Sequence, residues 1–192
     1  MSLDEWKELL FQWSKDILGN AKYKEYVPAD AIDKEQGRIG YPGADEFLLA
    51  EAESRLGVAL PNSYKEFLKI TNGWPIAGQY VERILPVQEI DWFATKSREW
   101  IEAWRYGLRI GLNEGNFSVL KKNLWFNEEH LDSALQISEG GFGVYLLNPQ
   151  VKFEHGEWEA WVFESETGAE LYRSFWELML AEYESFLRLK DV

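Results

Sequence analysis

The sequence predicts a single α+β domain, and three observations support this fold class. Apolar residues at helical spacing mark both ends of the chain and two segments between residues 45 and 72. Short apolar or alternating runs separated by turn residues fill positions 135–172, which is typical of strands. A length of 192 residues suits one domain, and 46% hydrophobic residues with 16% aromatic residues predict an aromatic-rich core.

An amphipathic helix is expected over residues 2–18. Ser2 and Glu5 have the spacing of a capping box, and Gly19-Asn20 provides the end of the helix. The apolar residues on its predicted inner face are Leu3, Trp6, Leu10, Trp13 and Ile17. We expect this face to pack on the core of the same domain, and docking of the helix on another chain is the alternative.

Residues 1–43 are predicted to form an N-terminal helix and connector packed on a domain at 44–192. Between residues 21 and 43 no periodic pattern is sustained, and glycine and proline are frequent. A segment of about 40 residues is too short to hold a core of its own. We therefore expect it to wrap the domain.

The most regular stretch, 44–74, predicts two helices joined by a tight turn. The first runs from about Asp45 to Leu56 and ends at Gly57, a residue that adopts the left-handed conformation without strain. The second starts near Pro61, whose fixed φ suits a first helical position, and ends at Asn72-Gly73.

The second of these helices carries further signals. Ser63 and Glu66 have the spacing of a capping box. Its predicted inner face consists of Tyr64, Phe67, Leu68 and Thr71. This pattern indicates a helix with one buried side.

Residues 80–130 are less regular. A strand is predicted at 80–85, and 87–93 is compatible with a strand or a short helix. A helix is expected over 97–105, with Ser97 as N-cap and Gly107 as its end. The region from 107 to 130 allows no assignment.

The last third predicts strands followed by a closing helix. Runs at 135–138 and 144–147 flank a glycine-rich turn, which favours a hairpin, and Asn148-Pro149 is expected to end the second run. A strand at 158–163 and a pairing segment at 169–172 follow. Ser174 and Glu177 have capping-box spacing, and the apolar face expected after them is Trp176, Met179, Leu180, Tyr183 and Leu187.

The charge of the chain restricts its partners. A formal net charge of −13 makes nucleic acid an unsuitable partner, because such binding depends on Lys and Arg neutralising phosphates. A basic protein partner suits this charge better, although an acidic surface also serves solubility alone. No run approaches the length of about 20 apolar residues that spans a membrane, so no membrane partner is expected.

Residue usage also predicts a cytoplasmic protein. The sequence has no cysteine, which excludes disulfides and thiolate metal sites. The first residues carry acids where a secretory signal would carry basic residues.

One set of spaced residues resembles a known family. The pattern comprises Glu53-x-x-Leu56-Gly57, Leu60-Pro61-x-x-Tyr64-x-x-Phe67 and Asn72-Gly73. It is similar to the signature of the SMI1/KNR4 superfamily, also called SUKH. The resemblance implies a SUKH-like α+β domain, with a mostly antiparallel or mixed sheet packed by helices. It also implies a binding function: bacterial members are largely immunity proteins against polymorphic toxins, many of them nucleases, and eukaryotic members are regulatory or scaffold proteins.

Within this signature each residue has a structural explanation. An acid at the place of Glu53 is typical of the resembled family, and we expect it to accept backbone hydrogen bonds from a neighbouring turn or to pair with an arginine. Asn72 is interpreted as a helix stop. The signature is therefore assigned to the fold and not to recognition.

No pattern in the sequence predicts catalysis, a metal site or a cofactor. His130 and His155 lack the spacing of a metal site. Glu157 and Glu159 flank Trp158 on a predicted strand, and this alternation indicates the solvated face of a half-buried sheet. We expect a protein that is not an enzyme.

The leading functional expectation is an immunity protein that neutralises a cognate toxin of basic character, such as a nuclease. The alternatives are an intracellular regulatory or scaffold module that binds host proteins, and an aromatic pocket for a small ligand. Candidate partner-binding residues are Trp92, Trp100, Trp104, Trp125 and Phe126. Burial in the core is the competing explanation for each of them.

Overall fold

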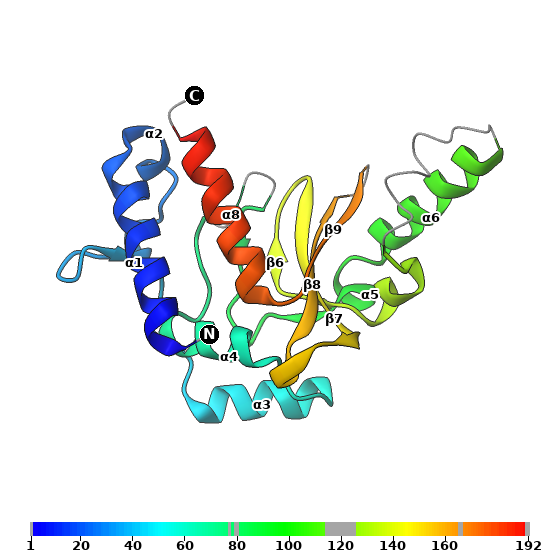
Figure 1. Ribbon diagram of the computed structural model, residues 1–192, viewed down its shortest axis with the longest axis horizontal. Helices are drawn as coiled ribbons and strands as arrows, with labels where there is room; N and C mark the ends of the chain where they lie inside the picture. The colour runs from blue at the N-terminus through cyan, green and yellow to red at the C-terminus, as the bar shows by residue number, and fades with distance from the viewer. Residues whose placement is uncertain (1, 77, 79–80, 114–125, 165–166, 191–192) are drawn as a thin grey trace.

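The computed structural model describes residues 2–76, 78, 81–113, 126–164 and 167–190 (Figure 1). An antiparallel sheet of five strands, in the order β4-β5-β7-β8-β9, lies between two groups of helices. The strands are β4 (Asp91–Trp92), β5 (Leu135–Gln136), β7 (Gly143–Lys152), β8 (Trp158–Glu164) and β9 (Gly168–Tyr172). The α+β class and the antiparallel sheet are as predicted.

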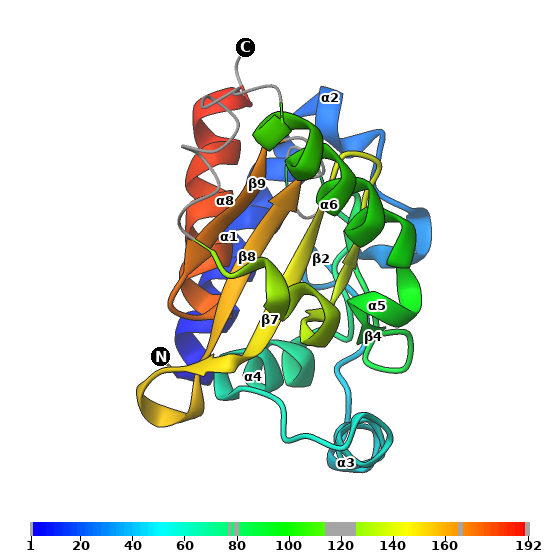
Figure 2. The ribbon, with the colours of Figure 1, turned by 90° about the vertical axis from the view of Figure 1, so that its right-hand side faces the viewer.

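Three helices, two of them from opposite ends of the chain, cover one face of this sheet. They are α1 (Leu3–Gly19), α4 (Asn62–Ile70) and α8 (Phe175–Leu189). α1 and α8 lie side by side, and α3 (Glu46–Leu56) lies at the lower end of the view in Figure 1. The opposite face is covered by α5 (Phe93–Lys96), α6 (Arg98–Asn113) and the 3-10 helix η2 (Glu128–Ser133), which face the viewer in Figure 2.

Short elements connect these layers. Two antiparallel two-stranded ladders pair β1 (Ile32–Asp33) with β2 (Arg38–Ile39), and β3 (Arg83–Ile84) with β6 (Ser138–Glu139). The remaining short helices are α2 (Ala21–Lys24), η1 (Ala29–Ala31) and η3 (Glu154–Gly156). β3 covers part of the strand predicted at 80–85, whose first residue, Tyr80, lies outside the described residues.

The helix expected at 2–18 forms as α1. The Ser2 hydroxyl accepts a hydrogen bond from the Glu5 N–H at 3.3 Å, and the Glu5 carboxylate accepts one from the Ser2 N–H, which completes the capping box. Its buried face comprises Trp6, Leu9, Leu10, Trp13, Ser14 and Ile17. The face belongs to the same hydrophobic cluster as α4 and α8.

The two helices predicted between 45 and 72 form as α3 and α4. Asp45 caps α3 by accepting the Leu48 N–H at 2.9 Å, and Gly57 ends it with a φ of 69°. Two details of the prediction were wrong. Pro61 precedes α4 in extended conformation, and Ser63 forms no capping box within the helix.

Ser63 instead bonds to Glu157, which lies directly before β8. Its N–H donates to the Glu157 carboxylate at 2.8 Å, and its hydroxyl donates to the other oxygen of the same carboxylate. A partner that lies 94 residues away satisfies the start of α4, so no local spacing could have indicated it.

Two predicted breaks do not occur. α6 continues through Gly107 to Asn113, because a glycine inside a helix costs only about 1 kcal/mol and does not end it alone. β7 continues past Asn148-Pro149 to Lys152. The register between β7 and β8 shifts between Asn148 and Lys152, so the proline lies in an irregular part of the ladder, where its missing N–H is tolerated.

The last helix, α8, starts as predicted. Of its predicted inner face, Met179 is buried, and Trp176, Leu180 and Tyr183 are partly buried and pack on the same hydrophobic cluster as α1 and α4. The Ser174 hydroxyl accepts the Glu177 N–H at 3.1 Å, while the Glu177 carboxylate accepts the N–H of Arg173 and not that of Ser174. Its buried residues are Phe175, Leu178, Met179 and Phe186. Leu187, which was assigned to the inner face, is 37% exposed.

Alternating side chains of the central strands contribute to two separate hydrophobic cores. Tyr145 and Leu147 of β7 join the large core, which also contains α1, α3, α4 and α8. Val144 and Leu146 point to the other face and join the small core under α5 and α6. The two-residue period of a strand therefore supplies both cores from one segment.

Candidate functional site

The signature acid Glu53 connects α3 to α4. Its carboxylate accepts the Leu60 N–H at 2.8 Å and pairs with the Lys65 ammonium at 3.2 Å. The backbone hydrogen bond from a neighbouring turn is as predicted. The paired cation is a lysine and not the predicted arginine. Arg55, which no sequence pattern singled out, donates to the carbonyls of Ile90 and Val87 and holds α3 against the segment before β4.

Asn72 binds that same segment from the other side. Its side-chain carbonyl accepts the Val87 N–H at 2.7 Å, and its amide donates to Gln88 at 2.9 Å. The following Gly73 has a φ of 105°, and a Cβ there would lie 3.0 Å from the Ile84 carbonyl oxygen. Asn72 and Gly73 therefore fix the path of the chain directly after α4.

The other signature side chains lie in the interior. Leu56, Leu60 and Phe67 are at most 6% exposed, and Pro61 is also buried. Tyr64 is fully buried, which raises the pKa of its hydroxyl far above the usual range. The signature surface therefore offers a partner little to contact.

Four of the five aromatic residues proposed for partner binding lie in the described part of the chain, and these four are buried or half-buried. Trp104 is 4% exposed and packs against Phe126 and Phe163 at ring distances of 5.8 and 5.6 Å. Trp92, Trp100 and Phe126 are half-buried and pack on the two cores. Trp125 lies outside the described residues.

The aromatic side chains that are exposed come from other segments. Among the described residues, the most exposed are Phe142 at 77%, Phe47 at 73%, Tyr26 at 71% and Tyr106 at 62%. Phe142 and Tyr26 border the same groove of about 600 Å³, which Pro75, Ile76 and Glu82 also line. The sequence did not distinguish these two residues from the many buried aromatics.

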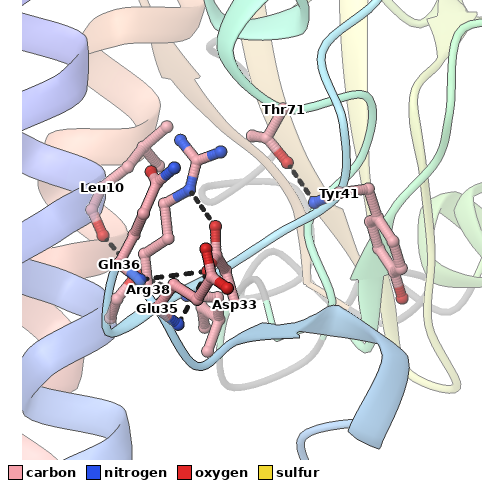
Figure 3. Close-up of polar contacts among 9 residues, drawn as sticks. Leu10, Asp33, Glu35, Gln36, Arg38, Tyr41 and Thr71 are labelled. Atoms are coloured by element: carbon pink, nitrogen blue, oxygen red, sulfur yellow. Dashed lines mark hydrogen bonds and ion pairs between the residues drawn. The ribbon is translucent and has the colours of Figure 1, made fainter.

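A second groove, of about 490 Å³, lies between α1 and the β1–β2 hairpin. The Asp33 carboxylate accepts the N–H groups of Glu35 and Gln36 and pairs with Arg38 at 3.6 Å, which fixes the turn of the hairpin (Figure 3). The Tyr41 N–H donates to the Thr71 hydroxyl at 2.9 Å. The charged side chains that line this second groove are of both signs, so the groove has no strong preference for a positive or a negative ligand. They are Asp4, Lys7, Glu8 and Arg38.

Glu157, Glu159 and His130, which were considered for chemistry, have structural partners. Glu159 accepts hydrogen bonds from the Asn148 amide at 3.0 Å and the Trp161 indole at 2.8 Å. His130 lies within 3.1 Å of Asn127 and 3.0 Å of Asn148. Glu157 and Glu159 were predicted on a solvated face, but both are half-buried and hydrogen-bonded.

Neither a metal site nor a membrane span is found in the described part of the chain. No group of three or more His, Cys, Asp or Glu side chains in it is arranged to hold a metal ion. None of its helices combines the length and apolar character needed to cross a bilayer.

A family model described as the SMI1/KNR4 family (SUKH-1) matches residues 43–181. The chain belongs to this family. SUKH domains are commonly immunity proteins of polymorphic toxin systems and are generally non-catalytic. No curated protein matches the chain. The SUKH match begins after α1 and the hairpin, so one wall of the 490 Å³ groove is formed by residues that precede it.

One carboxyl directly after the matched range, that of Glu182 on α8, has a strongly raised pKa. Burial raises the pKa of Glu182 on α8 to about 7, although the hydrogen bond from the Tyr145 hydroxyl lowers it. The nearby acids Glu170 and Glu164 raise it further. Gly78 packs directly on this pair, because a Cβ there would overlap Glu182 and Tyr145. The Glu182 carboxyl is half-buried at the edge of the large core.

Proposed function

We propose that this SUKH protein is a non-enzymatic immunity protein that binds a cognate polymorphic toxin and neutralises it. The family match over residues 43–181 carries this proposal. The net charge of −13 supports a basic toxin, such as a nuclease, because opposite charges accelerate the encounter of two proteins. We further propose that the protein acts in the cytoplasm, where such a toxin reaches its target.

Inhibition by binding requires a surface and not a reacting group. The acids that flank β8 are engaged with Ser63, Asn148 and Trp161. Exposed aromatic side chains remain available at Phe142 and Tyr26, and residues of this type supply much of the affinity at protein interfaces. These features suit a binding protein.

Co-expression tests the proposal. The toxin is taken from a gene that neighbours the gene of this protein and encodes a secreted protein with a C-terminal toxin domain. It is expressed in cells with and without this protein. We expect the chain to restore growth, and the purified proteins to form a complex. Failure to restore growth against every neighbouring toxin would refute the immunity function. Recovery of a native host protein, together with that failure, would favour the regulatory alternative.

The salt dependence of association tests the electrostatic part separately. If acidic side chains steer the toxin, the association rate should fall steeply between low and physiological ionic strength. A rate that does not change with salt would remove the electrostatic steering and leave the immunity function standing.

A further inference from the structure

The groove bordered by Tyr26 and Phe142 combines two features that a folded protein usually avoids. Phe142 is 77% exposed and Tyr26 is 71% exposed, and both line the same hollow of about 600 Å³. Burying a side chain of this size stabilises a protein by about 1.5–3 kcal/mol, which neither residue gains here. Two exposed aromatics that share one groove indicate a surface that another molecule covers.

Three segments that are distant in sequence build this groove. Tyr23 and Tyr26 come from α2 and the turn after it, Pro75 and Ile76 follow the signature, and Phe142 lies in the glycine-rich turn between β6 and β7. α2 and this turn both lie at the upper end of Figure 1, opposite α3. Tyr23 itself is anchored, since its ring contacts Phe186 of α8 at 5.0 Å. The apolar floor is therefore attached to the large core.

The charges at the groove favour a basic partner on the side of Phe142. The Arg83 guanidinium is neutralised by Glu139 at 2.9 Å and Glu89 at 3.1 Å. Glu82 is exposed, and within the described residues its carboxylate has no ion pair. A Cβ on Gly141 would lie 3.8 Å from this carboxylate, so a free negative charge lies beside Phe142. On the side of α2, Lys22 lies over the Tyr23 ring at 5.7 Å.

We propose that this groove is the toxin-binding surface, and that it receives a segment in which an apolar side chain is adjacent to a lysine or arginine. This inference rests on the proposed immunity function. The apolar side chain inserts between Tyr26 and Phe142, and the basic residue pairs with Glu82. Burial of the aromatic pair supplies most of the affinity, while the ion pair mainly raises the association rate.

Binding of the purified toxin domain to single variants tests the surface. Phe142→Ser and Tyr26→Ser should each weaken the affinity by about ten- to hundredfold. Phe47→Ser is the matched control, because Phe47 is similarly exposed but lies on α3. The affinity of this variant for the toxin domain should stay within about twofold of wild type. All three variants should unfold at the wild-type urea concentration. Wild-type affinity in both groove variants would overturn the inference, while the immunity function would stand.

The charge assignment has its own variant pair. Glu82→Gln should lower the association rate severalfold and reduce its dependence on salt. Glu51→Gln removes one exposed acid from α3 and should change neither. Equal effects of the two substitutions would show that only net charge matters and would contradict a specific pairing at Glu82.

A peptide selection tests the groove without the toxin. Random short peptides displayed on phage are selected on the full-length wild-type protein. We expect enriched peptides to contain an aromatic or aliphatic residue beside Lys or Arg, and to lose binding to Phe142→Ser but not to Phe47→Ser. Failure of enrichment, or equal binding to both variants, would overturn the inference. A toxin that does not bind the wild type would refute the proposed function, and the selection would still decide the groove.

Discussion

The large core and the small core share the strands β7 and β8, but they draw their other residues from different parts of the chain. The large core joins Trp6 near the N-terminus to Phe186 near the C-terminus. Among the described residues, those of the small core all lie between Phe93 and Leu171. The SUKH match covers the whole of the small core, whereas the large core also needs α1, which precedes the match. The helix before the matched region is thus part of the interior.

The largest expected effect comes from removing the first aromatic of α1. Trp6 is fully buried among Phe67, Phe175 and Trp176, with ring distances of 4.7–5.6 Å. Trp6→Ala should lower the free energy of unfolding by about 4 kcal/mol, measured by urea denaturation. Phe11→Ala on the exposed side of the same helix is the control and should cost less than about 1 kcal/mol. A similar small loss for Trp6→Ala would show that α1 is not integral to the large core.

The corresponding substitution in the small core should cost somewhat less. Trp104 is 4% exposed and is held by Phe126 and Phe163, and we expect Trp104→Ala to cost about 3 kcal/mol. Because both cores share β7 and β8, circular dichroism and tryptophan fluorescence should report a single transition in this variant. Two separate transitions would mean that the small core unfolds on its own.

The pH dependence of stability tests the edge of the large core at Glu182. Its pKa is raised from 4.5 to about 7 in the folded protein, so the folded state retains a proton that the unfolded state has released. Stability from this group is therefore complete below about pH 4.5 and falls by about 2–3 kcal/mol as the pH rises through 7.

Glu182→Gln should remove this dependence, because glutamine does not titrate and still accepts a hydrogen bond from Tyr145. The difference in unfolding free energy between variant and wild type should thus grow in favour of the variant between pH 4.5 and a pH above 7. Urea denaturation at several pH values measures it. A difference that stays constant would contradict the raised pKa of Glu182.

The smallest effect is expected in the connection between the two cores. Asn72 holds Val87 and Gln88, which lie between β3 beside the large core and α5 in the small core. Asn72→Ala leaves the Val87 N–H without its acceptor and should cost about 1–2 kcal/mol. Asn72→Asp retains the acceptor oxygen and should recover most of this loss. Equal losses in both variants would mean that the hydrogen bond to Val87 is unimportant.

Elements governed by local spacing could be predicted from the sequence. Ser2 and Glu5 started α1, and Gly57 ended α3, since caps depend on residues within one turn. Ser63 shows where this approach stops, because its partner Glu157 is brought near only by the complete fold. Gly107 and Pro149 were interpreted as breaks because local preference is weak beside packing that a single sequence does not display.

The candidate site was harder to predict for the same reason. Trp104 and Phe142 are both large aromatics. The position of α6 over the sheet buries Trp104, whereas Phe142 is exposed in the turn between β6 and β7. The glycines around Phe142 were a usable signal for a projecting turn, but composition alone did not separate a projecting aromatic from a buried one.

The pairing of α1 with α8 also sets the order of events in synthesis. Asp16 accepts a hydrogen bond from Tyr183 and pairs with Lys190, and these contacts span 167 and 174 positions of the chain. The apolar face of α1 leaves the ribosome long before α8 exists to cover it. The large core therefore cannot close before α8 has been synthesised, and contacts of this separation make folding slow. For an immunity protein, the delay between translation and protection would then be set by the closure of α8 on α1.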